Sequence, residues 1–178
     1  MAVDCLCMTI APNHPTLAAV PSDAADTAVA DVTALLPARE AVLARLAEQL
    51  PATDGTPATL LVIGLVRRGD GWQTSAETIA QVTRLLARSL RGEDRLGGSG
   101  PAEFVIVMAG PAVGAHTAAH RLVTAVEGLG VPGLSAAAGI APLSADLPAV
   151  EALRRATRSL TAARRVGPGG VVQLRGPA

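Results

Sequence analysis

An arginine and an aspartate three residues apart, Arg91 and Asp94, carry the clearest chemistry in this sequence. They lie at the end of a predicted helix and before a glycine-rich segment. An arginine fork can donate two N–H groups to the O6 and N7 atoms of a guanine base, or to a phosphate. A carboxylate can accept hydrogen bonds from the N1–H and amino groups of guanine. Side chains of these two types could together contact a base or a phosphate, but their spacing alone does not assign them that role.

The same spacing also has a structural explanation. Fifteen arginines and eight aspartates in 178 residues produce about one Arg-x-x-Asp sequence by chance. The chain has a second such sequence at Arg67 and Asp70. In the structural alternative, Arg91 forms an ion pair at the C-terminal end of a helix and Asp94 caps the turn. Only its position in the chain distinguishes the Arg91 pair.

Other reactive side chains are expected to have no chemical role. His116 and His120 have a spacing that can hold a metal, but no third ligand accompanies them, so a packed or solvated pair is expected. Cys5 and Cys7 are too few for a disulfide scaffold and have no second cluster to complete a metal site. Trp72 could stack on a base, but filling the core above a short loop is the expected role. We expect neither a metal nor a cofactor.

Composition indicates one globular domain of ordinary size. Hydrophobic residues make up 49% of the chain and aromatic residues only 1%, so the core must consist of Ala, Val, Leu and Ile. The formal net charge of zero gives no overall field that would attract nucleic acid or an anionic membrane. The N-terminus does not read as a signal peptide, and the longest apolar runs are far short of the ~20 residues of a spanning helix. We expect a soluble, cytoplasmic chain with no nucleic-acid or membrane partner.

The apolar pattern predicts helices that alternate with strands. Residues 1–30 show no sustained period and are expected to form a flexible N-terminal extension. Thr74 and Glu77 form a predicted capping box at the start of the second helix. The last helix is expected to turn three large apolar residues inward: Val150, Leu153 and Leu160. The predicted helices cover residues 37–50, 74–91, 112–127 and 147–165, and the predicted strands cover 59–66, 103–108, 134–141 and 171–174. Such alternation predicts a mixed α/β sheet covered by helices.

The stretch from residue 31 to residue 174 resembles the GGDEF family of diguanylate cyclases. Gly100-Pro101-Ala102-Glu103-Phe104 stands where that family carries Gly-Gly-Asp-Glu-Phe. The family's opening motif is matched by Asp31, Leu36, Pro37 and Arg39, and its closing motif by Ala156, Leu160, Ala163, Gly167 and Val171. The resemblance implies a degenerate GGDEF-like domain over residues 31–175. It implies a nucleotide-cyclase-like α/β fold, a ferredoxin-like palm with a central five-stranded mixed sheet flanked by helices.

The resemblance also implies that cyclase activity is lost. The family joins two GTP molecules into cyclic di-GMP, and carboxylates hold its Mg²⁺ against the triphosphate. Here Gly64 and Val66 stand where the first strand should supply a carboxylate, and Ala102 replaces the aspartate of the motif. Pro101 takes the place of the glycine that lets the backbone approach the nucleotide. Glu103 is retained but is expected to lack a partner.

Arg164 replaces a lysine that contacts the GTP phosphates in the family. It could still hold a phosphate, but a place on a solvent-facing, arginine-rich helix side is the default expectation. The segment 67–75 is shorter than its counterpart, and no Asn and Asp pair that could read guanine is found in it. These features support the same expectation of a catalytically silent domain.

The family's product site assigns roles to Arg91 and Asp94 and adds a second arginine from the helix after the hairpin, here Arg121. The resemblance thus implies an inactive domain that binds cyclic di-GMP or another guanine nucleotide through these three residues. The alternative is a domain without a ligand that acts in dimerisation or in binding a protein partner. In either case a homodimer or a protein partner is expected.

Overall fold

A central strand, β1 (Ala58–Arg67), organises the fold. This computed structural model describes residues 36–53, 55–67 and 74–174. Within them the strands form one sheet in the order β2-β3-β1-β4-β5. β1 is antiparallel to both of its neighbours and β5 runs parallel to β4, so the sheet is mixed, as expected. The other strands are β2 (Arg95–Gly100), β3 (Glu103–Ala109), β4 (Leu134–Pro142) and β5 (Val171–Gln173).

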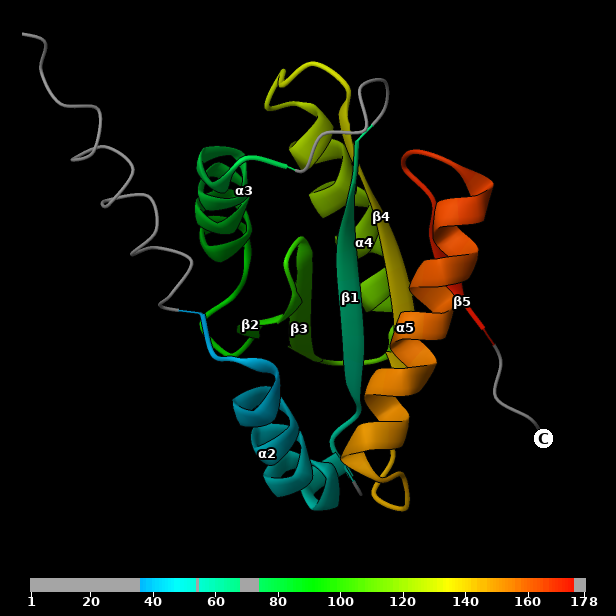
Figure 1. Ribbon diagram of the computed structural model, residues 1–178. Helices are drawn as coiled ribbons and strands as arrows, with labels where there is room; N and C mark the ends of the chain where they lie inside the picture. Colours follow the sequence, from blue (N-terminus) through cyan, green and yellow to red (C-terminus); the bar gives the residue numbers. More distant parts are fainter. Residues whose placement is uncertain (1–35, 54, 68–73, 175–178) are drawn as a thin grey trace, which may run out of the picture.

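Helices cover both faces of this sheet (Figure 1). Successive side chains of a strand point to opposite faces. Leu61 and Ile63 of β1 therefore pack in one core cluster with α3 (Ala76–Ser89) and α4 (Ala112–Glu127). Leu60 and Val62 pack in a second cluster with α2 (Arg39–Gln49) and α5 (Ala149–Val166). A short 3-10 helix, η1 (Leu50–Thr53), leads from α2 toward β1. A strand buried on both faces explains the continuous apolar run that predicted it.

Small residues let α5 approach the sheet closely. All of β4 except its last residue is buried, and much of it is alanine. A Cβ at Gly139 would collide with the backbone of α5 at Ala156 and Leu160. The glycine is therefore a requirement of the helix-to-sheet distance. Ser159 on the same helix is fully buried and donates a hydrogen bond to the Ile140 carbonyl (3.1 Å), while its oxygen accepts from Leu174 N (3.1 Å).

Several predicted helix boundaries shift by one or two residues. α2 begins at Arg39 rather than at Pro37, because the Pro37 carbonyl accepts a hydrogen bond from Gly98 N (3.0 Å) and so belongs to the segment that borders β2. The predicted capping box of Thr74 and Glu77 is wrong by one residue. Ser75 is the N-cap of α3, and its Oγ accepts a hydrogen bond from the N–H of Thr78 (3.2 Å).

The last helix differs at its start. α5 begins at Ala149, not at 147, and Val150 is 62% exposed although it was predicted to point inward. Leu147, in the segment that precedes the helix, is buried and covers that end of the core instead. Leu153 and Leu160 are buried as predicted. α4 has the predicted bounds, and the last strand lies at the sheet edge as predicted.

Some predictions lie outside the described residues. They are the extension over residues 1–30, the cysteines, Asp31, Asp70, Trp72 and most of the segment 67–75. Among the described helices, none combines the length and the apolar character needed to cross a bilayer.

Candidate functional site

The residues of the predicted ligand site come from two separate parts of the chain. Arg91 and Asp94 lie in the turn between α3 and β2, and Arg121 lies on α4. All three line one cavity of about 220 Å³. The other residues of its wall come from the end of β3 and the first half of α4, and include Met108, Gly110 and Thr117. The structure therefore brings together the three side chains that sequence reasoning selected.

Asp94 holds the turn that carries Arg91. Its side chain accepts a hydrogen bond through Oδ2 from the N–H of Arg91 (3.0 Å), and its own N–H donates to the Arg91 carbonyl (3.1 Å). Asp94 is only 8% exposed. Among the described residues no ion pair joins the Arg91 side chain to Asp94, so that half of the structural alternative is absent. The other half, capping of the turn by Asp94, is present.

Arg121 is fixed by the neighbouring helix. Its Nη2 donates to the carbonyl of Ser89, the last residue of α3, at 3.0 Å. A cation at the C-terminal end of a helix is favourable because the unpaired carbonyls there carry partial negative charge. This contact places the Arg121 guanidinium at the end of α3, in the wall of the cavity that Arg91 and Asp94 also line. The rest of its N–H donors stay available for an anion or a base.

A second hollow lies beside the β2–β3 hairpin, where the family would carry its catalytic groups. This cavity of about 540 Å³ is lined by residues 36–39, 98–101 and 103–104 and by Ile79. Gly100 ends β2, and Pro101 and Ala102 form the connection to β3. Ala102 packs its side chain against the core, while its carbonyl accepts a hydrogen bond from Leu65 N (2.9 Å).

A guanidinium occupies the space above Gly64. Gly64 of β1 is directly opposite Glu103 of β3 in the sheet register. A Cβ at Gly64 would collide with Nη2 of Arg164 and would lie 2.9 Å from its Cζ. Nη1 of Arg164 is 2.9 Å from Oε1 of Glu103, and Ser99 Oγ lies 3.3 Å from Oε2. Both oxygens of Glu103 are therefore engaged, by Arg164 and by Ser99.

This arrangement does not fit a divalent cation. Mg²⁺ needs several oxygen ligands in nearly octahedral geometry, and proteins usually supply one or two carboxylates. Glu103 is the only acidic residue of the hairpin cavity within the described chain, and it is paired with Arg164. Val66 offers an apolar side chain that packs against the core. No group of three or more His, Cys, Asp or Glu side chains in the described residues is arranged to hold a metal ion.

Sequence reasoning missed the role of Arg164. The only local signal is Gly64 in the middle of an apolar strand, because a glycine in such a place often marks the close approach of another group. His116 and His120 both lie on α4, and the described residues bring no third His, Cys, Asp or Glu side chain to them in an arrangement that could hold a metal ion.

The architecture is that of a nucleotide-cyclase-like α/β domain with a five-stranded mixed sheet. Several solved structures that are similar to the chain are GGDEF domains, and the chain is a GGDEF-like domain in its fold. The GGDEF domain of DgcB from Caulobacter crescentus, in complex with c-di-GMP, is 19% identical with a TM-score of 0.66, over 78% of this chain and 91% of that chain. The GGDEF domain of PA1120 (YfiN or TpbB) from Pseudomonas aeruginosa is 19% identical with a TM-score of 0.67, over 80% and 99%.

A third similar structure is the active GGEEF domain of a diguanylate cyclase from Vibrio cholerae. It is 18% identical with a TM-score of 0.65, over 80% of this chain and 99% of that chain. No model of a protein family matches the sequence. No curated protein matches it either.

Proposed function

We propose that this chain is a catalytically silent member of the GGDEF family that binds cyclic di-GMP, or another guanine nucleotide, through Arg91, Asp94 and Arg121. The observation that carries the proposal is that these three residues line one cavity. Two arginines offset the negative charge of a phosphate ligand, and the carboxylate accepts from a guanine edge. The GGDEF domain of DgcB, which has the same fold, was solved in complex with c-di-GMP.

The size of the cavity limits the mode of binding. About 220 Å³ is below the 300–1,000 Å³ typical of sites that enclose a whole drug-sized ligand. The cavity suits one guanine base or one phosphate, with the rest of a dinucleotide lying outside it. Arg91 is exposed and must be ordered by the ligand, whereas Asp94 and Arg121 are already held by hydrogen bonds.

Calorimetry with cyclic di-GMP tests the binding proposal. The full chain should release or absorb heat on titration, and Arg91→Ala should abolish the signal. Arg88→Ala is the matched control, because Arg88 is an exposed arginine of the preceding helix turn that does not line the cavity. Absence of heat with the unaltered chain, at any accessible concentration, would reject the nucleotide-binding function.

Loss of catalysis is a separate part of the proposal. It is supported by the Arg164 guanidinium above Gly64 and by the single, paired carboxylate of the hairpin cavity. Incubation of the full chain with GTP and Mg²⁺ or Mn²⁺, followed by chromatography, should give no cyclic di-GMP. Product formation that is lost in Glu103→Gln would overturn this part while leaving the binding proposal intact.

A second candidate function is dimerisation or binding of a protein partner without any nucleotide. It is favoured by one observation: Asp94 and Arg121 already have structural partners in the Arg91 turn and at the end of α3. Under this alternative the three residues stabilise the fold, and calorimetric titration with the nucleotide gives no heat of binding. A cytoplasmic location and a homodimer or protein partner belong to both versions of the proposal.

A further inference from the structure

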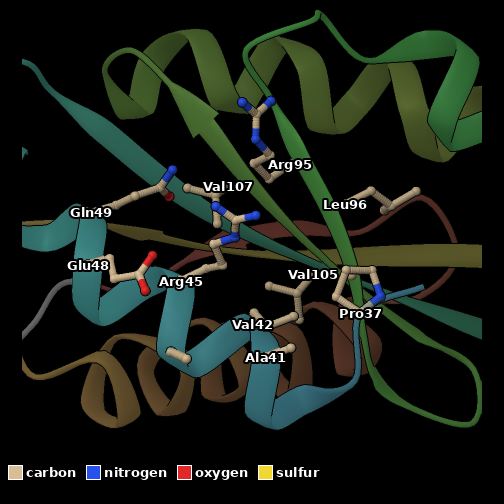
Figure 2. Close-up of a pocket in the computed structure, with 12 residues that line it drawn as sticks. Pro37, Ala41, Val42, Arg45, Glu48, Gln49, Arg95, Leu96, Val105 and Val107 are labelled. Carbon is tan, nitrogen blue, oxygen red and sulfur yellow. The ribbon is translucent and has the colours of Figure 1, made fainter. Parts of the chain in front are cut away.

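A third cavity lies on the α2 side of the sheet, next to the hairpin cavity and separate from the Arg91 cavity. We call it the α2–β2 groove; its volume is about 420 Å³ and it runs between α2 and the edge strand β2, with β3 as its floor. It shares only Pro37 with the hairpin cavity and no residue with the Arg91 cavity. Figure 2 shows the residues that line it. Its volume lies within the range of small-molecule sites.

Small residues create the groove. Ala41 and Ala44 face it from α2, and neither has a side chain long enough to reach the strands. Gly97 of β2 allows the helix to lie close at one end, because a Cβ there would collide with the side chain of Val42. The helix is thus pinned near Gly97, and space is left further along, beside Ala44.

The floor of the groove is apolar. Gly97 and Arg95 of β2 are paired in register with Val105 and Val107 of β3, so these four residues share the face that α2 covers. Val42 and Val105 are buried, and Val107 is partly buried. An occupant of this floor must therefore present an apolar group.

The rim supplies a positive charge and a hydrogen-bond acceptor. Figure 2 shows Arg45 and Gln49 extending from α2 toward Val107. Among the described residues, no hydrogen bond or ion pair engages the Arg45 guanidinium. Oε1 of Gln49 is buried and has no hydrogen-bond partner in the described part of the chain, so the side chain must rotate to present this oxygen to an occupant of the groove. A buried acceptor without a donor is destabilising, so it favours a ligand that brings an N–H or O–H group.

The net charge of the rim favours an anion. Glu48 also lines the groove and opposes an anion, but two arginines, Arg45 and Arg95, outweigh it. The Arg95 guanidinium is held at the turn before β2, where its Nη1 donates to the carbonyls of Gly92 (2.8 Å) and Asp94 (3.1 Å). Its charge therefore contributes to the field at the rim, while Arg45 is the group that can form a direct pair.

We propose that the α2–β2 groove binds a small amphipathic carboxylate with an amide N–H, of the class of N-acylated apolar amino acids. The carboxylate pairs with Arg45, the amide N–H donates to Gln49 Oε1, and the apolar side chain covers Val42, Val105 and Val107. This site is independent of the nucleotide proposal, because the two cavities share no residue.

The probe is N-acetyl-leucine, titrated into the ¹⁵N-labelled full chain and followed in ¹H–¹⁵N NMR spectra. Amide signals of α2, β2 and β3 at the groove should shift and saturate. N-acetyl-leucinamide lacks the carboxylate, and 2-acetoxy-4-methylpentanoate has an ester oxygen in place of the N–H. Each should bind about tenfold more weakly, which corresponds to the loss of one good polar contact.

Variants of the chain test the same contacts from the protein side. Arg45→Gln and Ala44→Leu should each weaken N-acetyl-leucine about tenfold or more, the first by removing the charge and the second by filling the cavity. Glu48→Gln should strengthen it. Arg84→Gln, at an exposed position on α3 across the sheet, should leave it unchanged.

Three results would overturn the proposal. They are the absence of saturable shifts at the groove, equal binding of N-acetyl-leucinamide, and binding that Ala44→Leu does not affect. Self-association of the full chain that Ala44→Leu abolishes would assign the groove to a second copy of this chain instead, and would equally reject a small-molecule site. Circular dichroism of each variant confirms that it is folded.

Discussion

Nη1 of Arg164 lies 2.9 Å from Oε1 of Glu103, and this ion pair joins α5 to the first residue of β3 directly above Gly64. The two side chains are 36% and 24% exposed, so the pair by itself is worth no more than about 1 kcal/mol. Its importance is spatial. The guanidinium of Arg164 fills the space that a side chain at position 64 would otherwise occupy. The glycine at position 64 and the location of the Arg164 charge therefore depend on each other.

Gly64→Ala should therefore destabilise the chain by about 1 kcal/mol, because the new Cβ displaces the flexible end of Arg164 and presses on Leu160. Urea denaturation measures the change. In an Arg164→Ala background the cost of Gly64→Ala should shrink, since the guanidinium is gone, and the double-mutant cycle reports the coupling. Equal costs in both backgrounds would contradict the close approach of Arg164.

Gly139→Ala is the contrasting substitution in the same sheet. There the Cβ meets the backbone of α5 at Ala156 and Leu160, and a helix backbone cannot move aside as the end of an arginine can. We expect a loss of about 3 kcal/mol or more in the free energy of unfolding, at the upper end of overpacking effects. A cost no larger than that of Gly64→Ala would mean that α5 is not held as tightly against β4 as these contacts indicate.

Substitutions in the turn that carries Arg91 distinguish a structural role of Asp94 from a ligand-binding role of Arg91. Asp94→Ala removes the acceptor of the Arg91 N–H and should cost about 1–2 kcal/mol of stability in urea denaturation. Arg91→Ala removes an exposed side chain and should change stability by less than about 0.5 kcal/mol. If Arg91→Ala proved as destabilising as Asp94→Ala, a loss of nucleotide binding in that variant would no longer report on the ligand.

The start of α3 offers a paired test of capping. Ser75→Ala removes the oxygen that accepts the Thr78 N–H and should cost about 1 kcal/mol. Thr74→Ala, one residue earlier, should be nearly neutral, because Thr74 lies before the N-cap. Thermal or urea denaturation measures the loss of stability in each variant. A larger loss for Thr74→Ala than for Ser75→Ala would show that Thr74 is the N-cap of α3, as the sequence pattern predicted.

Local signals explain which parts of the fold could be predicted. The bounds of α4 follow from Pro111 before its first residue and Gly128 after its last, which are common helix punctuation. β1 and β3 followed from continuous apolar runs, since a strand buried on both faces has no polar side. β2 (Arg95–Gly100) was not among the strands predicted from the apolar pattern, because its glycine-rich sequence has no such run. Val150 was misplaced because helix periodicity assigns it to the apolar side, whereas tertiary packing gives that place to Leu147.

The candidate site also has parts that could be predicted from the sequence and parts that could not. Arg91 and Asp94 are neighbours in sequence, and their turn could be recognised from spacing and position. Glu103 and Arg164 are far apart in the chain and meet only because β3 pairs with β1 while α5 packs over β1. No local pattern encodes that meeting. The α2–β2 groove was missed for a related reason. It exists because Ala41, Ala44 and Gly97 have small side chains or none, and the space they leave can be recognised only once α2 is packed on the sheet.

Three charged residues near the start of α5, Glu151, Arg154 and Arg155, predict how the stability of the chain depends on pH. Glu151 accepts hydrogen bonds from Arg154 (Nε, 2.6 Å) and from Arg155 (Nε, 3.1 Å). The hydrogen bond from Arg154, then that from Arg155, lowers the pKa of Glu151 from 4.5 to about 2. Since the folded-state pKa lies below the unfolded value, the stabilisation is complete above pH 4.5 and is lost as the pH falls through about 2. The same hydrogen bond raises the pKa of Arg154, which stays charged throughout this range.

An NMR titration of the Glu151 carboxyl group measures this shift directly. Arg154→Gln should move the midpoint toward 4.5 by more than Arg155→Gln does, because Arg154 donates two hydrogen bonds to the carboxylate, through Nε and Nη2. Other carboxyl groups titrate in the same range, so stability is compared as a difference: Glu151→Gln should lose less stability than the unaltered chain between pH 5 and pH 2. A midpoint near 4.5 in the unaltered chain would show that the arginines do not hold the carboxylate, and that this side of α5 is an unpaired cationic surface.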